Sequence, residues 1–111
     1  MHMLTAFNLV QGATLAEFRD ALDRLTEHMV SLDMLEETGP LGRRVRDTIM
    51  DTDEDRKQEY FFIMTFRNRA QCDRAVDYIL PRKEPGDSVH RGVEALVRDP
   101  VFLCWQDLDS R

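Results

Sequence analysis

Three histidines are the side chains of this sequence best suited to proton transfer or metal binding. His2, His28 and His90 show no metal-ligand spacing, so we expect no metal site. His28 lies beside Leu25 and Met29 on a predicted helix, which favours a packing role over that of a general base. His90 is expected on a solvated helix start. We therefore identify no catalytic residue among the histidines.

The two cysteines offer little more for chemistry. Cys72 falls in the first turn of a predicted helix, where a helix N-terminus can lower the pKa of a thiol. No basic partner is visible near it in the sequence, so a reactive role is disfavoured. Cys72 and Cys104 lie far apart in a chain without the cysteine density of a secreted scaffold, which indicates reduced thiols in a cytoplasm. We expect a cytoplasmic protein with no cofactor.

Two charged clusters have plain structural interpretations. The acidic run Asp51–Asp55 resembles a calcium loop, but Arg56 and Phe62 replace the required Gly and Glu, so calcium is rejected. The arginines in Arg43–Arg46 suit the exposed edge of a sheet. Contact with an anionic substrate at a cavity mouth is the alternative for them.

Hydrophobic periodicity gives the elements that must position any site. We expect strands at Met3–Val10, Arg43–Met50, Glu59–Phe66 and Val101–Leu108, a helix capped by Thr14 and Glu17, a second helix capped by Asn68, and a short helical piece capped by Ser88. The order βαββαβ predicts an α+β, ferredoxin-like fold with a four-stranded antiparallel sheet, as one domain over residues 1–111.

The segment EYFFIMTF, Glu59–Phe66, is apolar on both faces of the expected strand. In this fold both helices pack on one side of the sheet and leave the other side bare. Leaving several large apolar side chains in water would cost several kcal/mol at roughly 25 cal/mol per Å². The chain has no spare element to cover that face, so we predict a homodimer that packs sheet against sheet.

Element order and two-faced strands over Met3–Leu108 resemble the dimeric α/β-barrel superfamily. That superfamily includes stress-responsive barrel proteins, antibiotic-biosynthesis-type monooxygenases and small lactone isomerases. The resemblance implies a homodimeric barrel in which two sheets enclose a small cavity in each subunit, and this cavity often holds an aromatic or polyketide-like molecule. It also implies cofactor-independent oxygenation or isomerisation as candidate chemistry. A non-enzymatic stress or accessory dimer with a filled interface is the alternative.

A ligand cavity needs mostly apolar walls and a few polar groups that orient its occupant. In the simplest register one strand parity offers this mixture, from Leu4, Ala6 and Asn8, through Phe61, Ile63 and Thr65, to Phe102, Cys104 and Gln106. We predict that Asn8, Phe61, Thr65 and Gln106 bind a small apolar or aromatic ligand. The alternative is that the polar three satisfy hydrogen bonds at strand ends.

The opposite parity is a second candidate wall, with a core packed on the helices as its alternative. It contains Tyr60, Phe62, Met64 and Trp105. The sequence leaves the choice between the two faces open.

Composition excludes other classes of partner. The net charge of −6 disfavours nucleic acid, whose affinity comes largely from Lys and Arg contacts to phosphate. An RNA-recognition domain shares the element order, but Gln58 and Phe61 replace the small glycines of its aromatic motif. No apolar run approaches the roughly 18 to 20 residues that span a bilayer, so we expect no membrane partner.

Overall fold

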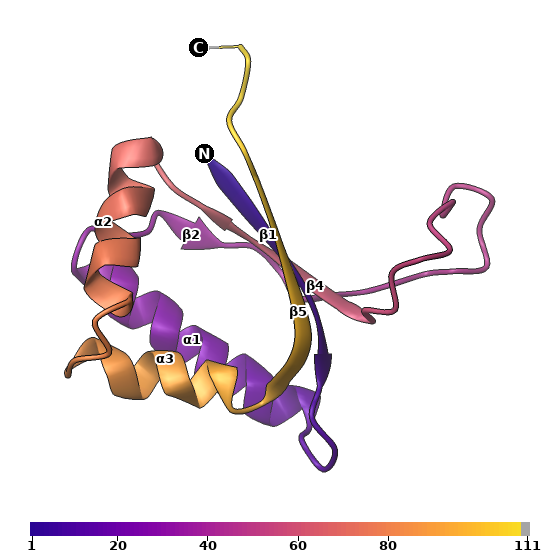
Figure 1. Ribbon diagram of the computed structural model, residues 1–111, viewed down its shortest axis with the longest axis horizontal. Coiled ribbons are helices and arrows are strands. Elements are labelled where there is room, and N and C mark those ends of the chain that lie inside the picture. Colours follow the sequence, from indigo (N-terminus) through magenta and orange to yellow (C-terminus); the bar gives the residue numbers. More distant parts are fainter. Residues whose placement is uncertain (110–111) are drawn as a thin grey trace.

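The computed structural model describes residues 1–109 and has an α+β fold (Figure 1). Its elements are β1 (His2–Leu9), α1 (Leu15–Ser31), β2 (Glu37–Thr38), β3 (Gly42–Arg43), β4 (Tyr60–Thr65), α2 (Arg69–Ile79), α3 (Gly86–Glu94) and β5 (Val97–Trp105). The strands form one antiparallel sheet in the order β2-β4-β1-β5, and β3 also pairs with β4. The helices all lie on one side of this sheet (Figure 1). The expected ferredoxin-like fold is confirmed.

The sheet has five strands where four were expected, because the second strand is split. The expected strand Arg43–Met50 is wrong: pairing with β4 occurs earlier, at β2 and β3, and stops after Arg43. Pro40 lies between the two short strands and has no N–H for a continuous ladder. Residues 44–59 form a long loop that extends away from the helices (Figure 1).

Side-chain caps begin two of the helices as expected. The Thr14 hydroxyl oxygen accepts a hydrogen bond from the Glu17 N–H, and the Asn68 side chain accepts one from the Gln71 N–H. The expected cap at Ser88 is wrong, because α3 begins two residues earlier and the Ser88 hydroxyl donates to the Glu84 carboxylate.

The last strand differs from its expected bounds. It runs from Val97 to Trp105, so Asp99-Pro100 lies inside the strand instead of preceding it. Asp99 has a φ of 54°, and the register between β1 and β5 shifts by one residue at this point. The shift is a β-bulge, which accommodates the proline on an edge strand.

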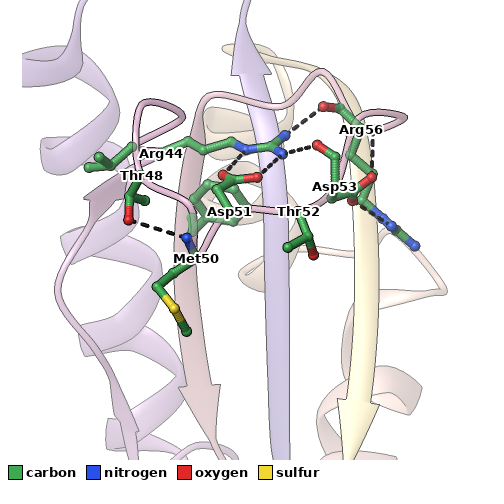
Figure 2. A pocket seen from close by; sticks show the side chains of 9 residues that line it. Arg44, Thr48, Met50, Asp51, Thr52, Asp53 and Arg56 are labelled. Atoms are coloured by element: carbon green, nitrogen blue, oxygen red, sulfur yellow. Dashed lines mark hydrogen bonds and ion pairs between the residues drawn. The ribbon is translucent and has the colours of Figure 1, made fainter.

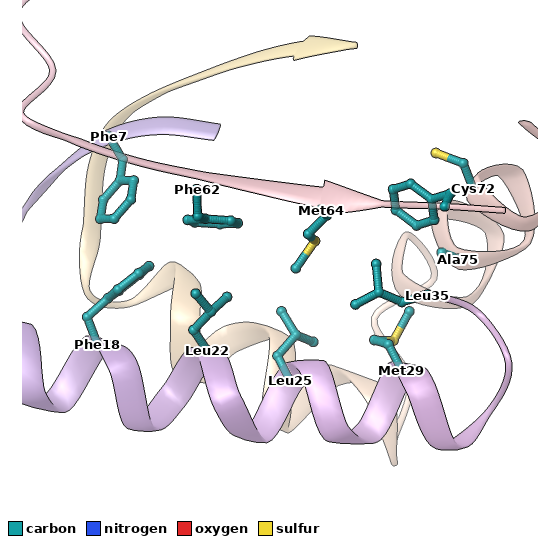
Figure 3. Packing of buried hydrophobic residues seen from close by; sticks show 11 residues of the cluster. Phe7, Phe18, Leu22, Leu25, Met29, Leu35, Phe62, Met64, Cys72 and Ala75 are labelled. Carbon is teal, nitrogen blue, oxygen red and sulfur yellow. The ribbon is translucent and has the colours of Figure 1, made fainter. Parts of the chain in front are cut away.

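The core lies between the sheet and α1. Phe7, Phe18 and Phe62 pack ring against ring, and the centroids of Phe7 and Phe18 are 4.5 Å apart (Figure 3). Phe7 and Phe18 are completely buried. The periodic apolar face of α1 continues the packing through Leu22, Leu25 and Met29, as the spacing of three and four predicts.

Candidate functional site

An apolar cavity of about 690 Å³ lies between the sheet and the helices. Its sheet wall includes Met3 and Thr5 from β1, Phe62 and Met64 from β4, and Phe102 from β5; its helix wall includes Leu25, Met29, Ala75, Val76, Ile79, His90, Val93 and Glu94. The volume falls within the range of roughly 300 to 1,000 Å³ that is usual for small-molecule sites.

The position of the cavity follows from the sizes of the side chains that lie between the sheet and the helices. At the end of the sheet near Phe7 and Phe18, aromatic rings fill the space between strand and helix (Figure 3). Farther along, Cys72 and Ala75 are the buried residues of α2 that line the cavity, and both are small. Side chains of this length leave space between α2 and the sheet.

The mouth of the cavity lies beside β5, the edge strand of the sheet. Among the lining residues, Leu80 on the α2–α3 connection and Phe102 on β5 are 72% and 60% exposed. Val76 is also exposed. Apolar side chains at the rim of an apolar hollow favour the entry of an apolar molecule.

Thr5 places an unpaired hydroxyl in the sheet wall of the cavity. The residue is 4% exposed, and its Oγ1 has no hydrogen-bond partner within residues 1–109. It lies in the middle of β1, between Phe62 on β4 and Phe102 on β5. A buried hydroxyl without a partner costs roughly 1 to 3 kcal/mol, which a ligand atom could recover.

His90 and Glu94 place a second polar group in the helix wall. His90 Nδ1 lies 2.7 Å from Glu94 Oε1, at the i, i+4 spacing of α3. The Arg82 guanidinium donates to both carboxylate oxygens of Glu94, at 3.1 Å each. These bonds lower the pKa of Glu94, and the charge of His90 lowers it further. Glu94 is therefore held as a carboxylate, while the buried His90 Nδ1 has no hydrogen-bond partner within residues 1–109.

The structure changes the role expected for His90. It lies in the middle of α3, is half-buried and lines the cavity, instead of starting a solvated helix. His28 lies elsewhere, with its Nε2 2.8 Å from the Tyr78 hydroxyl, so it links α1 to α2. Burial raises the pKa of the Cys72 thiol, which opposes a reactive role for it.

The four residues predicted to bind a ligand do not line this cavity. Asn8 is buried at the end of β1, where its side chain accepts from the Glu59 N–H and donates to the Lys57 carbonyl. Phe61 and Thr65 lie on the opposite face of β4 from Phe62.

Gln106 is exposed and follows the end of β5. The expected register is wrong for this strand, because Phe102 pairs with Thr5 and Cys104 pairs with Met3. Phe102 and Cys104 therefore share the helix side of the sheet, while Trp105 takes the other side. A ligand contact of Asn8, Phe61, Thr65 or Gln106 stays a prediction.

The sheet face away from the helices is largely apolar. Three cross-strand rows cover it, each running from β4 through β1 to β5: Phe61, Ala6 and Val101; Ile63, Leu4 and Leu103; and Thr65, His2 and Trp105. We call these nine residues the outer face. Leu103 is 51% exposed, and Ile63, Val101 and Trp105 are also exposed. Such a contiguous apolar patch is typical of a protein interface.

A second hollow, of about 520 Å³, lies under the 44–59 loop (Figure 2). The Arg44 guanidinium donates to both carboxylate oxygens of Asp51 at 2.7 Å, and to the carbonyls of Asp53 and Arg56 at 2.5 Å. Its donors are engaged within the loop, so the arginine holds the loop together. The anionic-substrate alternative loses its support at this residue.

Sequence reasoning missed Thr5, His90 and Glu94 as members of one site. Thr5 carried a signal, because it is the polar residue between Met3 and Phe7 on the buried parity of β1. The spacing of His90 and Glu94 is helical, but it becomes informative only once α3 is known to begin at Gly86.

No family model matches the sequence, and no curated protein matches it. Solved structures do. The protein At3g17210 from Arabidopsis thaliana aligns with a TM-score of 0.70 at 6% identity, over 99% of this chain and 97% of its own. A dimeric ferredoxin-like protein of unknown function from Thermobifida fusca YX aligns with a TM-score of 0.55 at 10% identity, over 92% of this chain and 85% of its own. The chain shares their fold.

Neither metal nor membrane features stand out in residues 1–109. No group of three His, Cys, Asp or Glu side chains there is placed to hold a metal ion. In the same part of the chain, none of the helices has the length and apolar character that crossing a membrane requires.

Proposed function

We propose that this protein is a homodimer that binds a small apolar or aromatic molecule in the cavity between the sheet and the helices of each subunit. The observation that carries the proposal is the cavity itself: about 690 Å³, apolar, open beside β5, with an unpaired buried hydroxyl in its wall. Cofactor-independent oxygenation or isomerisation of the bound molecule is the catalytic form of the proposal.

Two observations support the homodimer. The outer face exposes large apolar side chains, and the α1, α2 and α3 helices all lie on the other side of the sheet (Figure 1). The Thermobifida fusca protein of similar fold is dimeric. A second copy of the chain would cover the outer face with an equivalent face, which gives a closed, two-fold assembly.

A cavity-filling substitution tests the binding site. Ala75 is 7% exposed and lines the cavity, so Ala75→Phe would occupy part of its volume. We expect the substitution to weaken binding of naphthalene, measured by calorimetry, at least about tenfold, because the added ring takes the place of the ligand. Val30→Phe, on the exposed side of α1, is the matched control and should leave binding unchanged. Equal binding by the parent protein and Ala75→Phe would overturn the site.

A filled, non-binding dimer is the competing function. It predicts that native mass spectrometry of protein purified without denaturation finds a dimer with no retained molecule, and that naphthalene does not bind. A dimer that retains a small molecule supports the proposed function instead.

A further inference from the structure

The outer face alone is small for the interface of a stable dimer. It has nine residues, whereas an interface of standard size takes roughly 20 to 30 residues from each partner. If two copies of the chain pair through the outer face, surface next to it must be buried as well. The nine residues would then form the centre of the interface, and a neighbouring segment would supply the rest.

The 44–59 loop adjoins the outer face. Phe61 belongs to the first row of that face, and it also lines the hollow of about 520 Å³ under the loop (Figure 2). The outer face and the hollow are therefore one continuous surface. The loop extends beyond the sheet and away from the helices (Figure 1). A subunit packed on the outer face would meet the loop at this end of the sheet.

The 44–59 loop exposes large apolar side chains. Ile49 is 94% exposed, Met50 82% and Val45 60%. Val45 and Met50 also line the hollow. Single apolar residues on a surface are common, but a group of them that continues an apolar sheet face is typical of a protein interface.

Charged contacts fix the shape of the loop. The Arg44 side chain is only 7% exposed and donates to both carboxylate oxygens of Asp51, and the Arg56 guanidinium donates to the Asp53 carboxylate at 2.6 Å. The exposed Ile49 is not needed to hold this arrangement. A segment that is already ordered loses little conformational entropy when it binds, so the loop is preorganised for a partner.

We propose, building on the homodimer of the proposed function, that the 44–59 loop of each subunit binds a second copy of this chain. Ile49 and Met50 pack on the partner subunit, and the hollow beside Phe61 takes an apolar side chain from it. Two-fold symmetry makes each contact occur twice, once for each loop. The loops thereby extend the interface beyond the nine residues of the outer face.

Ile49→Asp tests the contact of the loop. Analytical ultracentrifugation of the full chain over a dilution series measures the Kd of the dimer. We expect this Kd to rise at least about a hundredfold, because one buried apolar side chain is lost from each of two loops. Leu80→Asp, at an apolar position 72% exposed at the end of α2, is the matched control and should leave the Kd unchanged. Melting curves verify that both variants are folded.

Photo-crosslinking locates the contact. The photo-reactive residue benzoylphenylalanine takes the place of Ile49, and light then joins it to the chain that lies against it. We expect a covalent dimer on a denaturing gel. Mass spectrometry should place the link on the outer face or in the 44–59 loop of the partner subunit. The same residue in place of Leu80 should give no covalent dimer.

The outcomes separate the role of the loop from the proposed function. If the parent protein is a monomer throughout the dilution series, the proposed homodimer fails, and the role of the loop fails with it. If the parent protein is a dimer and Ile49→Asp leaves its Kd unchanged, the role of the loop is overturned while pairing through the outer face stands. A link from position 49 that stays within one chain also overturns it, and the hollow would then be left to a small molecule.

Discussion

At the scale of single residues, the cavity is defined by polar groups that the apolar wall does not satisfy. Thr5 is the clearest example, because its neighbours Phe62 and Phe102 on the adjacent strands offer it no hydrogen bond. Asn8 is the opposite case: it is just as buried, and its amide bonds to the backbone at both its oxygen and its nitrogen. The unpaired hydroxyl of Thr5 is free to bind a ligand, whereas the bonded amide of Asn8 stabilises the fold.

Thr5→Val should therefore stabilise the empty protein while it weakens ligand binding. The substitution replaces an unpaired buried hydroxyl with a methyl group of similar shape, so we expect the free energy of unfolding to rise by about 1 kcal/mol. Urea denaturation of the ligand-free protein measures this change. Thr5→Ala is the control, because it removes the hydroxyl but also leaves a space. A loss of stability in Thr5→Val would mean that the hydroxyl has a structural partner.

At the scale of elements, the sequence offers several side chains that could cap a helix. The contacts of each helix in the folded protein decide which of these side chains is the cap. Thr14 caps α1, while Ser88 lies within α3 and bonds to Glu84. Gly86, the first residue of α3, allows α3 to approach α2 closely, because a Cβ built there would lie 2.5 Å from Tyr78 Cε2.

Alanine substitutions should distinguish the two hydroxyls. Thr14→Ala should lower the free energy of unfolding by about 1 kcal/mol, because the Glu17 N–H loses its partner. Ser88→Ala should change it by less than about 0.5 kcal/mol, because Ser88 caps no helix. Chemical denaturation of both variants measures the difference. Equal losses would contradict the observed start of α3.

The 44–59 loop should open in acid. Hydrogen bonds from the Arg56 side chain and from the Asp55 N–H lower the pKa of Asp53 to about 2, from an ordinary value of 3.8. A depressed carboxyl pKa stabilises the folded loop above the ordinary value, and this contribution is lost as pH falls through about 2.

NMR titration of the Asp53 carboxyl carbon measures this pKa. In Arg56→Gln the titration should move upward toward 3.8, because the largest cause of the shift is removed. A midpoint that stays where it is in this variant would show that Arg56 does not hold the carboxylate.

At the scale of the whole molecule, the sheet has two apolar faces with different uses. One packs on α1 and encloses the cavity, and the other is the outer face (Figure 1). If two copies pair through the outer face, each keeps its cavity on the far side of the sheet from its partner. The dimer then supports the sheet wall without filling the site.

Charge on the outer face should break the proposed dimer. Leu103→Glu places a carboxylate in the middle row of that face, 51% exposed in the single chain, and two-fold pairing would bury it without a partner. We expect a monomer by analytical ultracentrifugation at a concentration where the parent protein is dimeric. Val30→Glu, on the exposed side of α1, should stay dimeric. An unchanged dimer in Leu103→Glu would move the interface elsewhere.

The sequence by itself determined the three helices, the strands β1, β4 and β5, the two caps at Thr14 and Asn68, and the two-faced character of β4. These depend on local spacing and on side-chain chemistry, which act over a few residues. It also predicted the ferredoxin-like fold correctly, because helices and strands in this order have few ways to pack.

Only the tertiary structure decided which strand faces share a surface. The bulge at Asp99 shifts the register of β5 by one residue, and such a slip exchanges the two faces of a strand. It thereby placed Phe102 beside Thr5 in the cavity wall and Trp105 on the outer face. The close approach of α3 to α2 likewise depended on Gly86, where a Cβ would meet Tyr78. Contacts between residues far apart in the sequence set both features, so a segment of a few residues does not predict them.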